Sequence, residues 1–158
     1  ISGAHFNPVV SLIFWFKKII SLSDLVAYVL FQIIGAIFGC LAANIIFELP
    51  IITISTNVRH DLSQFLSEIL ATFGLVLVIF LAREVARLNI PVIVGSYIAS
   101  AYWFTSSTSF ANPAVTIARQ FSDTFTGISP SGIPSFVLAQ IFGAILGYIV
   151  VRWLFRGV

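Results

Sequence analysis

Long hydrophobic runs separated by short polar segments form the main pattern of the chain. Each run approaches or exceeds the roughly 20 apolar residues that an α-helix needs to cross a bilayer. The runs occupy residues 25–47, 63–82, 90–107 and 134–151. The pattern therefore predicts four membrane-spanning helices.

Two shorter apolar segments begin with the same dipeptide, which occurs as Asn7-Pro8 and as Asn112-Pro113. Asn is a favoured N-cap and Pro is favoured at the first helical position. The dipeptides therefore predict short helices over residues 8–16 and over about 113–121, both too short to cross a bilayer. One Asn-Pro pair is an ordinary turn signal. Two copies between long hydrophobic runs indicate a pair of re-entrant half-helices.

Composition indicates an integral membrane protein. Charged residues make up 9% of the chain and hydrophobic residues 59%, whereas about 25% of an average soluble domain is charged. A soluble domain of this size could not bury so much apolar surface. The net charge of +2, without a dense basic run, argues against nucleic-acid binding. The single cysteine, Cys40, cannot form an intrachain disulfide and is expected to act as a small buried hydrophobic residue.

The basic residues predict which side of the membrane each segment faces. If the Asn112 segment is re-entrant, six of the eight Lys and Arg residues lie on the cytoplasmic side, as the positive-inside rule requires. These six are Lys17, Lys18, Arg83, Arg87, Arg152 and Arg156. Arg59 is expected to be exposed, with His60 and Asp61, in a connecting loop over residues 51–62.

An internal repeat links the two halves of the chain. Gln32–Gly39 reads QIIGAIFG and Gln140–Gly147 reads QIFGAILG, at nearly the same separation as the two Asn-Pro pairs. Each copy has small residues four apart, which lets membrane helices approach closely. Because three hydrophobic runs separate the copies, the halves have opposite topology, as in an inverted repeat. The symmetry also predicts about two helices before Ile1.

Together these motifs resemble those of the aquaporin family, also called the major intrinsic protein family. The resemblance is to a bacterial-type member. Ser2–Val9 is similar to the family's first signature, with Val9 in place of the usual Ala. Asn112-Pro113-Ala114 matches the second signature. Glu68 and Thr72 resemble the polar pair at the start of the family's fourth helix. The resemblance covers the whole chain.

The resemblance implies an all-α integral membrane fold, an aquaporin-like inverted repeat in a right-handed bundle with two re-entrant half-helices. One channel domain would cover residues 1–158, with residues 1–47 as the C-terminal part of the first repeat and residues 63–158 as the second. Four full spans would be present, and about two N-terminal spans would be missing. A homotetramer in a lipid bilayer, the bacterial inner (plasma) membrane, is also implied.

The implied activity is passive flow of water and small uncharged solutes, with no cofactor. Each helix N-terminus carries about half a positive charge, so two half-helices that meet head to head would repel cations. Asn7 and Asn112 would each offer an amide donor to a passing oxygen. Carbonyl groups of residues 3–5 and 107–109 would form an acceptor ladder. Pore width and lining donors would then set selectivity.

The expected selectivity filter departs from the water-selective pattern. Water-selective members place Arg directly after the second Asn-Pro-Ala, where this chain has Val115. A wider, less polar constriction would admit glycerol-like polyols or neutral metalloid hydroxides. Arg119 could reach back toward Val115, because helical side chains lean toward the N-terminus, or it could pair with Asp123. Ser109 and one of residues 100–102, taken as Tyr102, complete the filter.

Two interpretations are open for Glu68 and two for His5. Glu68 is an ionisable group inside a span and is therefore expected to be functional. It either braces the half-helix loops by accepting hydrogen bonds from backbone N–H groups or relays protons. Bracing is favoured because no other carboxylate lies within a span.

His5 either lines the cytoplasmic mouth as a pH gate or is a static, hydrogen-bonded loop residue. The static interpretation is favoured.

Other functions are weighed against the channel. A coupled transporter with discontinuous helices is one alternative, and a structural membrane protein with a closed pore is another. The lack of a charge pair within the spans argues against the transporter. The sequence shows no metal-ligand cluster and no nucleophile–base pair, so no enzyme is expected.

Overall fold

The computed structural model describes residues 2–86 and 89–155, and every regular element in these residues is helical. Arg87 and Arg156, two of the basic residues assigned to the cytoplasmic side, lie outside the described residues. The chain forms two compact units, residues 1–60 with 112–137 and residues 61–111 with 138–158. The repeat boundaries expected from the sequence stay a prediction.

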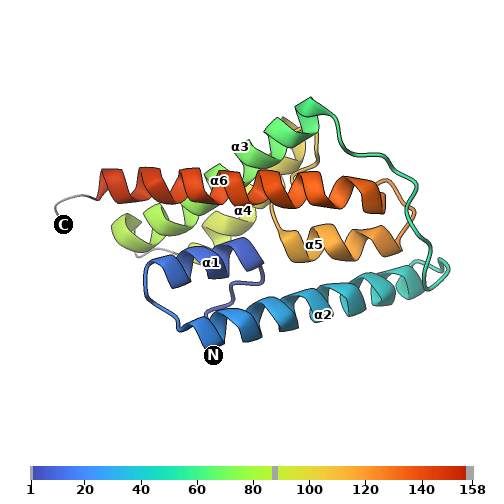
Figure 1. Cartoon of the computed structure of the whole chain (residues 1–158), viewed down its shortest axis with the longest axis horizontal. Coiled ribbons are helices and arrows are strands. Elements are labelled where there is room, and N and C mark those ends of the chain that lie inside the picture. The colour runs from blue at the N-terminus through green and yellow to red at the C-terminus, as the bar shows by residue number, and fades with distance from the viewer. Residues whose placement is uncertain (1, 87–88, 156–158) are drawn as a thin grey trace. The chain divides into compact units, whose positions relative to one another are not determined.

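The first unit holds both short helices. Its elements are α1 (Pro8–Phe16), α2 (Leu22–Ile46), α5 (Pro113–Ala118) and two 3-10 turns, Arg119–Phe121 and Pro130–Gly132. In Figure 1, α1 and α5 lie end to end in a row alongside α2, and they run in opposite directions from the point where their N-termini meet. The predicted short helices at the two Asn-Pro pairs are thereby confirmed.

Helix α2 begins at a capping box formed by Ser21 and Asp24. The Ser21 hydroxyl oxygen accepts from the backbone N–H of Asp24 at 3.0 Å, and the Asp24 carboxylate accepts from the backbone N–H of Ser21 at 3.1 Å. Two N–H groups that would lack helical partners are thus satisfied. The helix ends at Ile46, and Glu48 then adopts a left-handed φ of 57° before Pro50.

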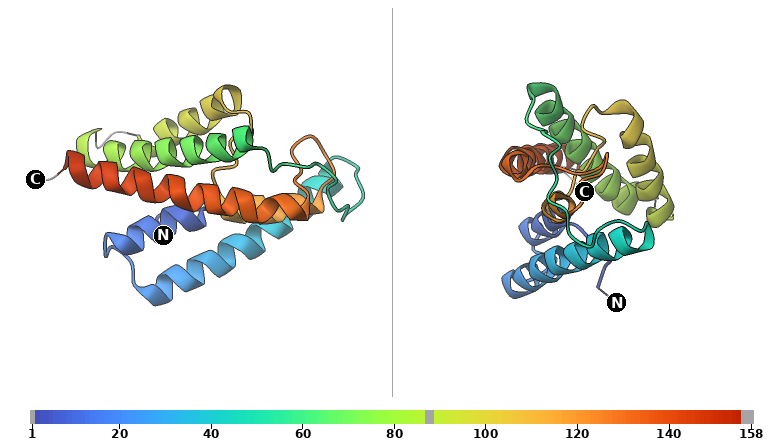
Figure 2. Two further views of the ribbon diagram at one scale, coloured as in Figure 1. Left: turned by 45° about the horizontal axis from the view of Figure 1, so that its top comes forward. Right: turned by 90° about the vertical axis from the view of Figure 1, so that its right-hand side faces the viewer.

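The second unit is built on close packing of α3 (Leu62–Leu81) with α6 (Ile133–Leu154), whose first turn belongs to the first unit. A Cβ atom added at Gly143 would clash with the carbonyl oxygen of Ile69, and one at Gly147 would lie 2.9 Å from Cβ of Val76. Figure 2 shows α3 running alongside α6. The predicted close approach of small residues is therefore confirmed for this copy of the repeat. In the other copy, Gly35 and Gly39 have open space among the described residues.

Helix α4 (Ile90–Phe104) completes the second unit and follows a π turn at Ala82–Ala86. It packs on α3, where the Tyr97 hydroxyl donates to the carbonyl oxygen of Ala71 at 2.9 Å. Among the described residues, three helices are long and apolar enough to cross a membrane, and α4 is shorter. The expected end of this span near Ser107 is wrong. The chain becomes extended at Thr105, because the segment that follows is bound to a buried carboxylate.

Candidate functional site

Asn7 and Asn112 cap their helices in the same way. Each has an extended backbone, with φ of −152° and −158°. The Asn7 side-chain oxygen accepts from the backbone N–H of Val9 at 3.1 Å. The Asn112 side-chain oxygen accepts from Ala114 at 3.0 Å and from Val115 at 3.4 Å. Both side-chain amides are therefore held at the N-terminus of a helix, with the oxygen turned inward to the helix.

The two Asn-Pro sites also contact one another. The side-chain nitrogen of Asn112 donates to the carbonyl oxygen of Phe6 at 2.9 Å, so the cap of α5 is joined to the loop that precedes α1. The N-termini of α1 and α5 face each other at this point (Figure 1). Partial positive charges of the two helices therefore converge there. An amide nitrogen carries two hydrogens, and the bond to Phe6 uses one of them.

The loops before the two Asn residues share an unusual backbone conformation. Residues four, three and one positions before each Asn have positive φ, from 47° to 76°. They are Gly3, Ala4, Phe6, Thr108, Ser109 and Ala111. Such angles are strained for residues with a Cβ atom and persist only where surrounding contacts hold them. The repeat is thus visible in the backbone, and the proposed acceptor ladder of carbonyl groups stays a prediction.

In the second unit, a buried carboxylate holds the strained loop over residues 107–111. Glu68 is fully buried. One oxygen accepts from the Ser107 hydroxyl at 2.6 Å and from the backbone N–H of Phe110 at 2.8 Å. The other accepts from the backbone N–H of Ala111 at 2.8 Å and from the side-chain nitrogen of Gln140 at 2.7 Å. Each carboxylate oxygen thus accepts two hydrogen bonds, two of the four from backbone N–H groups of the loop. These bonds favour bracing over proton relay.

Thr72, the expected partner of Glu68 in supporting the half-helix, is fully buried on α3. Its hydroxyl oxygen makes no hydrogen bond within the residues that the structure describes. Its Cβ atom lies where a side chain at Gly143 would approach to 3.0 Å. The contribution of Thr72 visible in this unit is therefore packing between α3 and α6, and its support of the half-helix stays a prediction.

His5 lies in a network of hydrogen bonds and ring contacts. Its Nδ1 is 3.1 Å from the hydroxyl oxygen of Ser11, which also accepts from the side-chain nitrogen of Gln32 at 3.0 Å. The Ser11 hydroxyl can donate to Nδ1 or accept from it, according to the tautomer of the ring. The ring also packs on Phe14 at 4.1 Å and on Tyr28 at 5.4 Å. These contacts favour the static interpretation, although His5 also lines a cavity of about 580 Å³.

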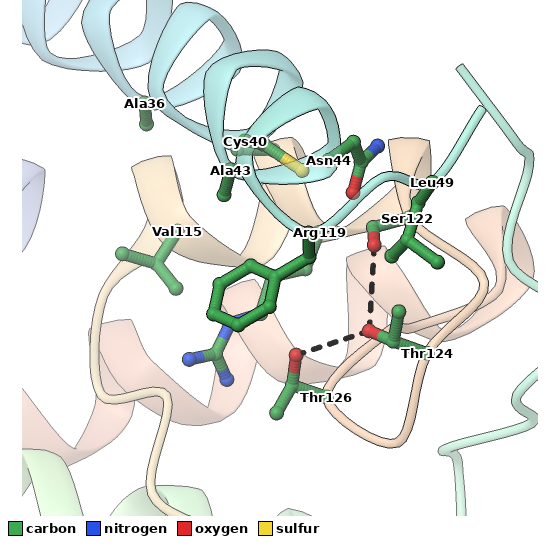
Figure 3. Close-up of a pocket in the computed structure, with 12 residues that line it drawn as sticks. Ala36, Cys40, Ala43, Asn44, Leu49, Val115, Arg119, Ser122, Thr124 and Thr126 are labelled. Carbon is green, nitrogen blue, oxygen red and sulfur yellow. Dashed lines mark hydrogen bonds between the residues drawn. The ribbon is translucent and has the colours of Figure 1, made fainter. Parts of the chain in front are cut away.

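Val115 and Arg119 line a larger cavity, of about 660 Å³, within the first unit. Figure 3 shows the Arg119 side chain extending back along α5 toward Val115. The Asp123 carboxylate, the alternative partner, accepts from the backbone N–H and the hydroxyl of Thr56 at 2.9 and 3.1 Å. The direction of the Arg119 side chain favours the reach-back interpretation. Ser109 is buried and Tyr102 exposed in the second unit, so membership of all four residues in one filter stays a prediction.

The expectation that Arg59 is exposed is wrong. Only 7% of this residue is exposed, because its guanidinium group donates to the carbonyl oxygens of Gly127 at 2.8 Å and Phe125 at 2.6 Å. His60 and Asp61 are exposed as expected. An Arg in a short polar loop gives no signal of burial, since its partners are backbone carbonyl groups more than sixty residues away.

Replacing Arg59 by lysine is expected to lower the free energy of unfolding by about 1–2 kcal/mol, because one compact ammonium group cannot satisfy both carbonyl groups. Thermal unfolding of the detergent-solubilised full-length protein would measure the change. The exposed Arg83 offers a matched control, since Arg83→Lys should change stability by less than about 0.5 kcal/mol. Equal melting temperatures for the two variants would show that the Arg59 contacts are not stabilising.

Within the described residues, no three His, Cys, Asp or Glu side chains come together in a way that could hold a metal ion. The polar groups around the two Asn-Pro sites include amides, hydroxyls and backbone carbonyls, together with the His5 ring and the Glu68 carboxylate. Such groups can exchange hydrogen bonds with a neutral solute.

The helical architecture and its long apolar helices define an integral membrane protein. The sequence model of the major intrinsic protein family matches residues 1–104. The chain belongs to this family.

Three relatives extend the comparison. The chain is 47% identical to the aquaglyceroporin AqpS of Rhizobium meliloti (strain 1021), over 99% of this chain and 67% of the relative. It is 28% identical to the glycerol uptake facilitator protein of Bacillus subtilis (strain 168), over 93% of this chain and 60% of the relative. It is 32% identical to aquaporin-4 of Notomys alexis, over 90% of this chain and 41% of the relative. The chain thus spans between 41% and 67% of the length of these proteins.

Proposed function

We propose that the protein is a passive transmembrane channel for water and small uncharged solutes. The observation that carries the proposal is the meeting of two short Asn-capped helices, whose N-termini are joined by the hydrogen bond from Asn112 to Phe6. Converging helix N-termini raise the energy of a cation at this point. Amide hydrogens of Asn7 and Asn112 offer bonds to the oxygen of a neutral solute. Membership of a channel family supports the same conclusion.

The pore is proposed to pass solutes larger than water. Val115 occupies the position at which water-selective members carry Arg, and it lines the cavity beside α5. Two of the relatives are named for glycerol, an aquaglyceroporin and a glycerol uptake facilitator. Glycerol-like polyols are therefore the first proposed solutes, and neutral metalloid hydroxides of similar size are the second. The proposed filter consists of Ser109, Val115, Tyr102 and Arg119.

The proposed location is the bacterial inner membrane, and the proposed assembly is a homotetramer. Three helices among the described residues are long and apolar enough to cross a bilayer, and two of the relatives are bacterial. The tetramer is taken from the family resemblance. Crosslinking of the full-length protein in native membranes would test it, and a monomeric or dimeric limit would overturn it.

The experiment for the proposed function is light-scattering swelling of proteoliposomes that contain the full-length protein. Water, glycerol and arsenous acid are compared with empty liposomes of the same lipid. Flow of water and at least one neutral solute, independent of any ion gradient, is expected. Solute entry that requires a proton or sodium gradient would instead indicate a coupled transporter, and no flow above that of empty liposomes would overturn the channel.

Replacing Val115 by arginine is expected to reduce glycerol permeability at least about tenfold relative to water permeability, because a bulky cation narrows the constriction. A tenfold change in this ratio corresponds to about 1.4 kcal/mol. Swelling rates in water and glycerol would measure the ratio. Val58 is 60% exposed in the loop after α2, so Val58→Arg adds the same charge as a control. Unchanged glycerol uptake in the Val115 variant would remove Val115 from the filter.

A further inference from the structure

The cavity beside α5 has one polar wall that the proposed filter does not use. It is lined by α2 on one side and by α5 with the loop that follows it on the other (Figure 3). Asn44 lies on α2, and Ser122, Thr124 and Thr126 lie on the loop. The remaining lining is largely apolar. The cavity therefore combines a line of hydrogen-bonding groups with a hydrocarbon surface.

Asn44 is a buried amide whose orientation is determined by its partners. It is 3% exposed, and its side-chain nitrogen donates to the carbonyl oxygens of Ile51 and Phe121, each at 3.0 Å. Exchanging the nitrogen and oxygen of the Asn44 amide would place its oxygen against both carbonyl oxygens, where no hydrogen bond can form. The nitrogen therefore faces Ile51 and Phe121, and the oxygen faces away from them. Figure 3 shows the Asn44 oxygen pointing toward the side of the cavity where Ser122 lies. The helix thus presents a firmly held acceptor to the cavity.

The loop after α5 presents a row of three hydroxyl groups. Ser122, Thr124 and Thr126 face the cavity, and the alternating residues Asp123 and Phe125 are exposed. The Thr124 hydroxyl is 3.3 Å from each of its two neighbours in the row. Three hydroxyl groups carry three hydrogens, and the two bonds use two of them. The row therefore keeps one donor, and because the hydroxyls can rotate, it can offer a donor or an acceptor at either end.

The hydroxyl row is held in place from behind by the connecting loop that follows α2. The Asn57 side-chain nitrogen donates to the carbonyl oxygen of Thr124. Arg59 donates to the carbonyl oxygens of Phe125 and Gly127. A side chain at Gly127 would clash with the carbonyl oxygen of Ser122. These contacts order the row before any solute arrives, which lowers the entropy cost of binding.

The charges around the cavity favour a neutral solute. The guanidinium group of Arg119 lines the cavity and repels cations. The Asn44 nitrogen is already bound to two carbonyl oxygens, so Asn44 presents its oxygen to the cavity, and this oxygen repels an anion beside it. Ala36, Ala43 and Ala118 supply apolar surface that suits C–H groups. A molecule with several hydroxyl groups on a short carbon chain matches both walls.

We propose that this cavity is a binding subsite for small neutral polyols, formed by Asn44 and the hydroxyl row of Ser122, Thr124 and Thr126. The proposal rests on the proposed channel function and deepens it. A polyol bound here would have its hydroxyl groups on the row and on the Asn44 oxygen, with its carbon chain on the alanines. Such a site retains polyols beside Val115 and Arg119, so that polyol flux saturates with concentration.

The test compares the full-length protein with the double variant Thr124→Val, Thr126→Val. Valine keeps the shape of threonine and leaves the backbone contacts of the loop, so the variant removes hydroxyl groups alone. Glycerol binding in nanodiscs is measured by saturation-transfer NMR, and the half-saturation concentration of glycerol flux is measured in proteoliposomes. Both should weaken by about tenfold, since two hydrogen bonds of roughly 0.7 kcal/mol each are lost. Ser122→Ala, which removes one end of the row, should weaken both by a smaller factor.

Thr53→Val is the matched control, because Thr53 lies on the connecting loop and is not among the residues that line the cavity. It should leave glycerol binding and half-saturation at the wild-type values. Unchanged glycerol binding in the double variant, with wild-type thermal stability, would overturn the subsite. Competition by arsenous acid as strong as that by glycerol would overturn the assignment to polyols, since arsenous acid has hydroxyl groups and no carbon chain.

Failure of the subsite and failure of the channel give different results. A wild-type protein that conducts water and glycerol, with a double variant that binds glycerol equally well, would reject the subsite alone. A wild-type protein that conducts neither, but binds glycerol through the hydroxyl row, would reject the channel and support the subsite.

Discussion

Replacing Glu68 by alanine is expected to abolish solute flow and to lower the free energy of unfolding by at least about 3 kcal/mol, because each buried donor that loses its acceptor costs about 1–3 kcal/mol. Four donors lose their acceptor in this variant: the Ser107 hydroxyl, the backbone N–H groups of Phe110 and Ala111, and the Gln140 amide. The loop that precedes Asn112 contains strained residues with positive φ. Without the carboxylate, this loop should relax. Thermal unfolding and proteoliposome swelling would measure the two effects.

Glu68→Gln separates charge and acceptor number from side-chain size. Glutamine has nearly the same shape, but one oxygen becomes an amide that donates and therefore faces another donor. A loss of about 1–3 kcal/mol is expected, smaller than for alanine. Glu48 is exposed in the loop after α2, so Glu48→Gln serves as the control for the same chemical change. A Glu68→Ala protein with wild-type stability and flow would show that the loop does not depend on this carboxylate.

Replacing Gly143 by alanine is expected to lower the free energy of unfolding by about 1–3 kcal/mol, the usual cost of overpacking a close interface. The added Cβ atom would clash with the carbonyl oxygen of Ile69 and approach Cβ of Thr72 to 3.0 Å. Neither the α3 backbone nor the base of a side chain can move without shifting a helix. Because α3 carries Glu68, a shift of α3 away from α6 should also weaken the bond from Gln140 to Glu68 and reduce solute flow.

The same substitution at Gly95 on α4 is expected to leave stability unchanged or to raise it. Within the described residues, nothing lies within 4 Å of a Cβ atom at this position, and alanine is a better helix former than glycine by roughly 1 kcal/mol. Gly95→Ala should therefore keep or raise the melting temperature. Equal effects of Gly143→Ala and Gly95→Ala on the melting temperature would contradict the close packing of α3 and α6.

Local features of the chain were readable from the sequence because they depend on neighbouring residues. The N-caps at Asn7 and Asn112 act on N–H groups two or three residues away. The Gly-rich copy at residues 140–147 signals close packing because small side chains recur on one helical face. The family signatures also indicated the channel class, since they consist of contiguous residues.

Contacts between distant segments were not readable in this way. Arg59 was expected in solvent, and it is buried against carbonyl groups of residues 125 and 127. Asn44 lies within an apolar span and belongs to no motif, yet it joins the end of α2 to the turn after α5. The three hydroxyl residues in the loop after α5 belong to no motif in the sequence. Backbone carbonyl groups occur in every residue, so no side-chain pattern reveals which of them an amide or guanidinium will reach.

The sequence by itself determined the apolar helices, the two capped half-helices and the repeat, because helix formation and membrane burial follow from composition and short-range spacing. Only the tertiary structure decided that Glu68 accepts four hydrogen bonds, that Arg119 extends toward Val115 and that Asn44 faces a row of hydroxyl groups. These arrangements depend on which residues meet across long separations in the chain. Those meetings depend on how whole helices pack, as α6 does on α3 where Gly143 lies against Ile69, and not on any single residue.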